Sequence, residues 1–207
     1  MLKPWYKIVT PREDLREGQP LDAAEFAVHL DQVRDGRAPE DYQNPARFFD
    51  RTYLTANLTD LAAQVLRRPD RRRSETSAVF NLATQFGGGK THALTLLYHL
   101  AQGGAAAQYW TGVSRLLDKA GLKALPQAAV AVFVGTEFDS LTGRGGKDGT
   151  PLRRTPWGEI AYQLGGAEAL AVLAEHEAQF IEPKGDVIRD FLPKDRPVLI
   201  LMDEIIN

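Results

Sequence analysis

The chain has 207 residues, a formal net charge of −2 and a hydrophobic fraction of 43%. This length suits one domain of ordinary size, the apolar content supports a packed core, and the near-neutral charge favours neither nucleic acid nor a membrane as a partner. Because the sequence contains no cysteine, disulfides, cysteine-based zinc sites and thiol nucleophiles are excluded.

The N-terminal region, residues 1–73, is predicted to be helical. It lacks the apolar core of a signal peptide, and no run in the chain approaches the roughly 20 apolar residues that cross a bilayer, so we expect a soluble, cytoplasmic protein with no membrane partner. Phe26, Leu30 and Val33 recur at helical spacing, and Leu58 to Arg68 predicts a second helix. The charged run "RRPDRRRSE" that follows is typical of a connector.

Residues 74–207 alternate buried strands with helices. The apolar runs Ser77 to Thr84, Ala128 to Gly135 and "RPVLILMDE" predict three strands. Helices are expected from His92 to Ala101 and over "VSRLLDKAG", "WGEIAYQL", "AEALAVLAEHEAQF" and "DVIRDFL", and the polar segment "TEFDSLTGRGGKDGTPLRRTP" reads as a long loop. This alternation predicts an α/β fold, with a parallel sheet covered by helices on its faces.

A glycine-rich loop follows the first predicted strand. "TQFGGGKT" approaches the G-x-x-x-x-G-K-[ST] pattern, in which backbone N–H groups and a helix N-terminus hold phosphate, the lysine reaches the β and γ phosphates and the hydroxyl reaches Mg²⁺. Thr84 stands where the pattern has its first glycine, and a turn with an exposed lysine is the alternative. The residues expected to bind ATP are Thr84, Gln85, Phe86, Gly87, Gly88, Gly89, Lys90, Thr91 and His92, with Lys90 also catalytic.

Two acidic residues, Asp203 and Glu204, follow the last predicted strand. Carboxylates at the end of a buried parallel strand lie where such sheets bind ligands. We expect Asp203 and Thr91 to hold Mg²⁺ and Glu204 to polarise the attacking water. The alternative is a strand end with solvated acids, but the joint occurrence of "GGGKT" and "VLILMDE" favours a nucleotide site.

The acidic pair also bears on topology. In the P-loop branch that carries such a glutamate (the ASCE branch, which includes AAA+ proteins), a further strand lies between the glycine-loop strand and the acidic strand, and it comes later in the sequence. This chain ends at Asn207. We therefore expect an incomplete P-loop core that stops after the acidic strand, with any sensor residues and arginine finger beyond it.

The chain resembles large AAA+-like ATPases of bacterial and archaeal anti-phage defence islands, related to those of Pgl and BREX systems. The resemblance is carried by "LKPWYKIVTPREDL", "NPARFFDRTYLT", "FGGGKTHALTLLYHL", "RTPWGEIAYQLGG" and "PVLILMDEI". It implies ATPase roles for Lys90, Thr91, Asp203 and Glu204, assembly into homo-oligomers, and a role in defence against foreign DNA beside partners such as a methyltransferase.

Other residues leave alternatives open. Phe49, Tyr53 and Leu54 either line an adenine pocket or pack in a helical cap, and Glu137 is either a partner of Glu204 or a surface acid. The basic runs "RRPDRRR" and "GRGGKDGTPLRR" either contact DNA phosphates or form a solvated face. The helical face of "RTPWGEIAYQL" indicates core packing.

The leading functional prediction is an ATP-hydrolysing motor or switch. Two alternatives are a nucleotide-gated binding module with negligible turnover and an interaction scaffold with a vestigial loop. We also expect negligible ATP hydrolysis by residues 1–207 alone.

Overall fold

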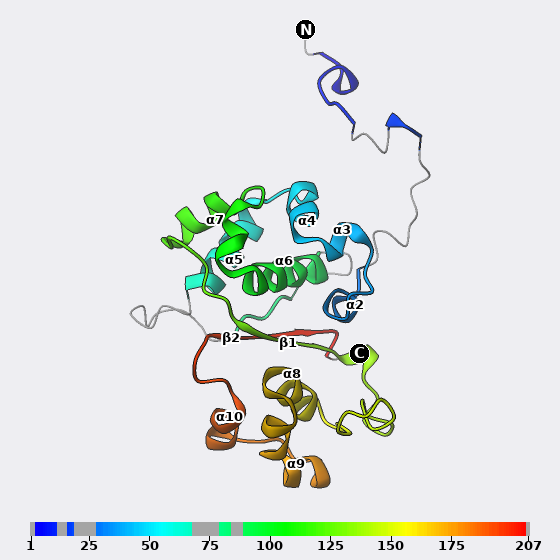
Figure 1. Ribbon diagram of the computed structural model, residues 1–207. Helices are drawn as coiled ribbons and strands as arrows, with labels where there is room; N and C mark the ends of the chain where they lie inside the picture. The colour runs from blue at the N-terminus through cyan, green and yellow to red at the C-terminus, as the bar shows by residue number, and fades with distance from the viewer. Residues whose placement is uncertain (1–2, 12–15, 19–27, 68–78, 84–88, 206–207) are drawn as a thin grey trace.

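The computed structural model describes residues 3–11, 16–18, 28–67, 79–83 and 89–205. Within these ranges, helices lie on both sides of a two-stranded parallel sheet (Figure 1). The predicted phosphate-loop residues Thr84, Gln85, Phe86, Gly87 and Gly88 lie outside the described residues, as do Phe26 and most of the run "RRPDRRR".

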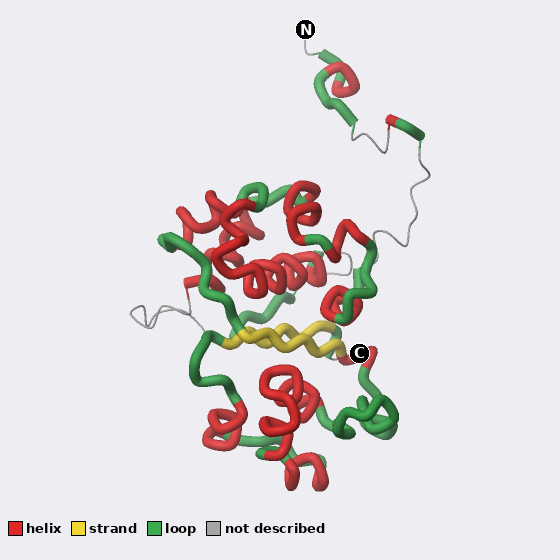
Figure 2. Tube along the Cα trace, viewed as in Figure 1, coloured by secondary structure: helices red, strands yellow, loops and turns green. Residues whose placement is uncertain are grey.

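The central strands are β1 (Ala129–Val134) and β2 (Val198–Asp203), which confirms the predictions for the second and third apolar runs. They pair in parallel, with Ala129 opposite Val198 and Val134 opposite Asp203 (Figure 2). Because strands in a parallel pair point the same way, the polar residues that follow them meet at one edge of the sheet.

Helices from both predicted regions of the chain pack on one face of the sheet. They are α2 (Leu30–Arg34), α3 (Glu40–Gln43), α4 (Pro45–Arg51), α5 (Ala56–Arg67), α6 (Lys90–Gly103) and α7 (Val113–Ala120), with the 3₁₀ turn η3 (Gly104–Tyr109). The N-terminal 3₁₀ turn η1 (Trp5–Lys7) lies apart from the sheet (Figure 1). The larger hydrophobic core joins Phe48 of α4 and Leu96 of α6 to Val132 and Leu201 of the strands. Helices α2 to α5 from the N-terminal region therefore share one core with α6, α7 and the two strands.

The opposite face carries α8 (Pro156–Ala171), α9 (Ala174–Gln179) and α10 (Gly185–Phe191) (Figure 1). Side chains alternate along β1, so Ala131 and Phe133 face this second core while their neighbours face the first. Ile160 packs there with the other apolar residues of the "RTPWGEIAYQL" face, which confirms the core-packing prediction. A break at Gly165 and Gly166 divides α8, as expected for two successive helices.

The two outer edges of the sheet differ. At β1, the Gln163 amide accepts a hydrogen bond from the Val132 N–H and donates one to the Val132 carbonyl, both at 2.8 Å. The Arg34 guanidinium also donates to that carbonyl, at 3.1 Å. Side chains thus satisfy the outward backbone groups of Val132 at the β1 edge, whereas no strand within the described residues pairs with the outer edge of β2.

The prediction of a strand from Ser77 to Thr84 is wrong for residues 79–83, the part of this segment that the structure describes. Residues 79–83 form no strand, and Val79 is 79% exposed. A strand needs a hydrogen-bonding partner, and this segment is separated from the outer edge of β2 by a groove that both of them line.

Candidate phosphate and magnesium site

The first turn of α6 begins the candidate site. Gly89 has the left-handed conformation, with φ 73° and ψ 23°, which glycine adopts without steric cost, and its carbonyl accepts the first helical hydrogen bond from Ala93. Lys90 and Thr91 are the first two helical residues. Their place at the positive end of a 14-residue helix suits groups that contact phosphate.

Thr91 and Asp203 come together although 112 residues separate them. The Thr91 hydroxyl donates a hydrogen bond of 2.7 Å to Oδ2 of Asp203. The other carboxylate oxygen, Oδ1, accepts from the Glu204 backbone N–H at 3.1 Å, and Asp203 is only 7% exposed. Both oxygens of this buried carboxylate therefore have donors, which fixes its orientation.

This pair of oxygen-bearing side chains fits the proposed Mg²⁺. Mg²⁺ in phosphoryl-transfer sites takes one or two protein oxygens and completes its shell with water and substrate phosphate. No group of three or more acidic, histidine or cysteine side chains suited to a metal occurs in the described part of the chain. Thr91 and Asp203 would therefore supply two of the ligands of such an ion.

Glu204 lies directly beyond Asp203 in a conformation that is uncommon for a residue with a side chain, at φ 48°. Its carboxylate Oε2 accepts a hydrogen bond of 2.8 Å from the hydroxyl of Thr136. Thr136 belongs to the 3₁₀ turn η4 (Gly135–Glu137) that follows β1. The parallel register explains this contact, because Val134 lies opposite Asp203 and the next residues of both strands are neighbours.

Thr136 is the functional candidate that sequence reasoning missed. That reasoning considered its neighbour Glu137 as a partner of Glu204. Glu137 is exposed, and its backbone carbonyl accepts a hydrogen bond from Arg144, so the surface-acid interpretation holds. The signal for Thr136 was present in the sequence: polar residues directly after two strands that pair in parallel are expected to meet.

The His92 side chain contacts residues of the N-terminal helices and the residue that follows α4. Its ring lies 4.7 Å from the ring of Phe48, and its Nε2 lies 3.1 Å from the Thr52 hydroxyl. Burial lowers the pKa of this imidazole. The predicted nucleotide contact of His92 is therefore left to its backbone rather than to its side chain.

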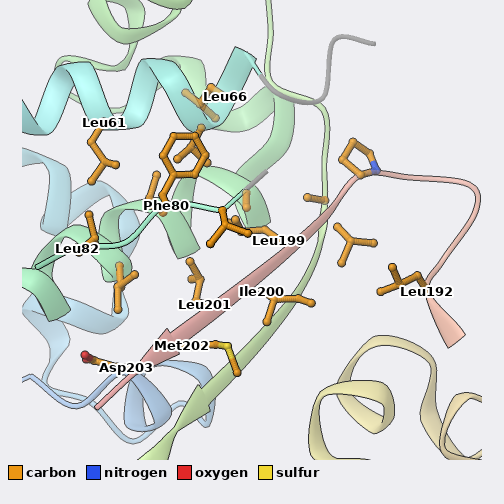
Figure 3. A pocket seen from close by; sticks show the side chains of 18 of the residues that line it. Leu61, Leu66, Phe80, Leu82, Leu192, Leu199, Ile200, Leu201, Met202 and Asp203 are labelled. Atoms are coloured by element: carbon orange, nitrogen blue, oxygen red, sulfur yellow. The ribbon is translucent and has the colours of Figure 1, made fainter. Parts of the chain in front are cut away.

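A groove of about 1450 Å³ opens beside the outer edge of β2 (Figure 3). Phe80 and Leu82 of the segment 79–83 lie across from Leu199 and Leu201 of β2, next to side chains of α5. The walls are mainly apolar.

Charged side chains also line this groove. Lys90, Asp203 and Glu204 are all among its lining residues. Lys90, at the start of α6, and the two acidic residues at the end of β2 thus line the same groove.

The adenine-pocket candidates separate into different environments. Phe49 is completely buried and stacks on Trp110 with ring centroids 5.3 Å apart, so it packs in the core. Leu54 is partly buried against the same core, whereas Tyr53 is 86% exposed. Of the three, only Tyr53 offers an open surface to a ligand.

The basic loop after β1 uses its arginines internally. Arg153 donates to Glu159 at 3.0 Å, and Arg144 lies 3.7 Å from the same carboxylate. Arg34 approaches Glu159 from α2, also at 3.7 Å. Glu159 is 3% exposed, so these guanidinium groups balance a buried charge. This explains two of the basic side chains without nucleic acid.

A family model described as DUF499 N-terminal domain matches residues 10–207, and the chain belongs to this family. No curated protein and no solved structure matches the chain. No helix in the described ranges is long and apolar enough to span a membrane.

Proposed function

We propose that this member of the DUF499 family is an ATPase of the P-loop class that binds ATP with Mg²⁺ at the first turn of α6 and the end of β2. The observation that carries the proposal is the hydrogen bond between Thr91 and Asp203. It joins the hydroxyl of a "GGGKT" motif to the carboxylate of a "VLILMDE" motif. Taken alone, the first motif could be a turn with an exposed lysine and the second a strand end with solvated acids, but neither alternative accounts for their contact.

Each side chain has a distinct task in this proposal. Lys90 neutralises charge on the β and γ phosphates, and the N–H groups of the first turn of α6 add donors. Thr91 and Asp203 hold Mg²⁺, which supplies charge neutralisation between the phosphates when bound. Glu204 takes a proton from the water whose oxygen bonds to the γ phosphorus, while the bond from that phosphorus to the β–γ bridging oxygen breaks and ADP leaves.

A nucleotide-gated binding module with negligible turnover is the second candidate. The contact between Thr136 and Glu204 favours it, because one oxygen of the proposed catalytic carboxylate is already occupied by a hydroxyl. Hydrolysis requires Glu204 to turn towards the attacking water. The two candidates therefore differ in the effect of Glu204→Gln: it traps ATP on an active ATPase and changes little in a binding module.

The wider role stays a proposal that rests on the resemblance. We infer a cytoplasmic, homo-oligomeric ATPase that acts in defence against foreign DNA, beside partners such as a methyltransferase. Arg144 and Arg153 are not expected to contact DNA, because both pair with Glu159.

Calorimetric titration of Mg-ATP into the protein and into its Lys90→Ala variant tests nucleotide binding. We expect binding by the wild type and none by Lys90→Ala. Lys123→Ala is the matched control, because Lys123 is exposed and precedes β1, at the other end of the strand from the site. Equal affinities for Lys90→Ala and Lys123→Ala would contradict the proposed site.

A further inference from the structure

The first turn of α6 has little local support. Gly89 at its N-cap has no side chain to accept a hydrogen bond from the exposed N–H groups, and helix ends without caps fray. The orientation of the first turn of α6 therefore depends on contacts with other elements of the fold. Thr91 binds β2 on one side, and His92 contacts α4 and the residue after it on another.

The proton in the contact between His92 and Thr52 can be assigned. The Thr52 hydroxyl lies 2.7 Å from the carbonyl of Phe48, one helical turn back, and a hydroxyl has a single proton to donate. Once that proton goes to Phe48, the oxygen of Thr52 is an acceptor. The 3.1 Å contact then requires that Nε2 of His92 carries the proton and donates it.

The ring of His92 also rests on a rigid surface. Phe48 is 1% exposed and belongs to the larger core, and the two rings are inclined by 34° with centroids 4.7 Å apart. Tyr42 meets the imidazole edge-on at 6.2 Å. The side chain that follows Thr91 is thus held by one hydrogen bond and two aromatic contacts from the N-terminal helices.

His99 repeats this arrangement farther along α6. Its ring lies 5.2 Å from Phe48, and its Nε2 lies 2.7 Å from the backbone carbonyl of Tyr42, an acceptor only. His92 and His99 therefore both donate to the N-terminal helices and both contact Phe48. They differ in distance from the phosphate-binding end, since seven residues of helix span roughly 10 Å.

We propose that His92 is a positioning residue for the nucleotide site: by donating from Nε2 to Thr52 it fixes the first turn of α6, and with it Lys90 and Thr91, against α4. This inference rests on the proposed nucleotide binding and deepens it. Because coupling is reciprocal, bound nucleotide should in turn stabilise α4 and Thr52.

The test compares His92→Phe with His99→Phe. Both keep an aromatic ring against Phe48 and lose one hydrogen-bond donor. We expect His92→Phe to weaken Mg-ATP binding about tenfold, the fold-change for one lost hydrogen bond, and His99→Phe to change it by less than about threefold. Urea unfolding should show a similar loss of stability for both variants.

Three further measurements separate positioning from general destabilisation. His92→Gln keeps an N–H donor and should restore binding to within about threefold of the wild type. Adding Thr52→Val to His92→Phe should weaken binding no further, because both remove the same hydrogen bond. Amide hydrogen exchange in residues 45–52 should slow when Mg-ATP binds to the wild type and less so in His92→Phe.

The outcomes distinguish this inference from the function on which it rests. If the wild type binds no Mg-ATP, the proposed function and the inference both fail. If the wild type binds but His92→Phe binds equally well, or if His92→Phe and His99→Phe weaken binding equally, the positioning role alone is refuted.

Discussion

Gly135→Ala tests the packing that places Glu204. A methyl group on Gly135 would lie 2.2 Å from the Glu204 carbonyl oxygen and 3.0 Å from the Ile205 Cα. The first distance is about 1.2 Å short of the 3.4 Å at which ordinary contact begins. Both neighbours are backbone atoms, so no side-chain rotation relieves the clash, and the strand ends must move apart.

The structure sets the size of the expected effect. Overpacking that forces a backbone shift costs about 1–3 kcal/mol. For a chain of this length each kcal/mol lowers the melting temperature by roughly 2–4 °C. In the protein that hydrolyses ATP, a shift of Glu204 relative to Thr136 and Asp203 should also slow hydrolysis more than it weakens ATP binding, because Glu204 acts on the water and not on the phosphates.

Urea unfolding of Gly135→Ala beside Gly185→Ala provides the measurement. Gly185 begins α10, has no heavy atom within 4 Å of an added methyl group, and is expected to change stability by less than about 0.5 kcal/mol. Equal stability of the two variants would refute the close approach of the strand ends. An unchanged ratio of hydrolysis rate to ATP affinity in Gly135→Ala would refute the role assigned to Glu204.

Four other predictions concern the site and its supports. In the protein that hydrolyses ATP, Glu204→Gln should retain bound ATP while turnover falls at least about a hundredfold, measured by filter binding and phosphate release. In the same assays Thr136→Val, which frees the Glu204 carboxylate, should leave ATP affinity unchanged and raise turnover. Burial lowers the pKa of His92 and of His99 below 6.5, so the unfolded chain takes up protons first as the pH falls, and stability should decline below about pH 6.5. Urea unfolding at several pH values should show a smaller decline when both histidines are replaced by glutamine. Glu159→Ala leaves its buried arginine partner unpaired and should cost about 3–5 kcal/mol in the same assay, and a loss below about 1 kcal/mol would contradict the ion-pair network.

Much of the fold follows from local patterns. The apolar runs that end at Gly135 and Asp203 are strands, and the helical spacing from Leu58 to Arg68 and after Lys90 predicts α5 and α6. These elements can be predicted from the sequence because a buried strand is a continuous run of apolar residues, whereas one buried helix face places apolar residues three or four positions apart. Segment 79–83 has the same apolar character, yet forms no strand, because a strand also depends on a partner that its own residues do not specify.

The candidate site shows the same division between local and long-range information. Motif spacing predicts that Thr91 and Asp203 share a site, since phosphate chemistry requires a hydroxyl and a carboxylate together. No sequence motif predicts the contact between Thr136 and Glu204 or the contact between His92 and Thr52. They arise from the parallel register of the strands and from the packing of α4 on α6. Local sequence therefore determined which segments are helices and strands and which residues are candidates for the chemistry. Only the tertiary structure decided which side chains orient these candidates, because the orienting contacts of His92 and Glu204 join residues 40 and 68 positions apart.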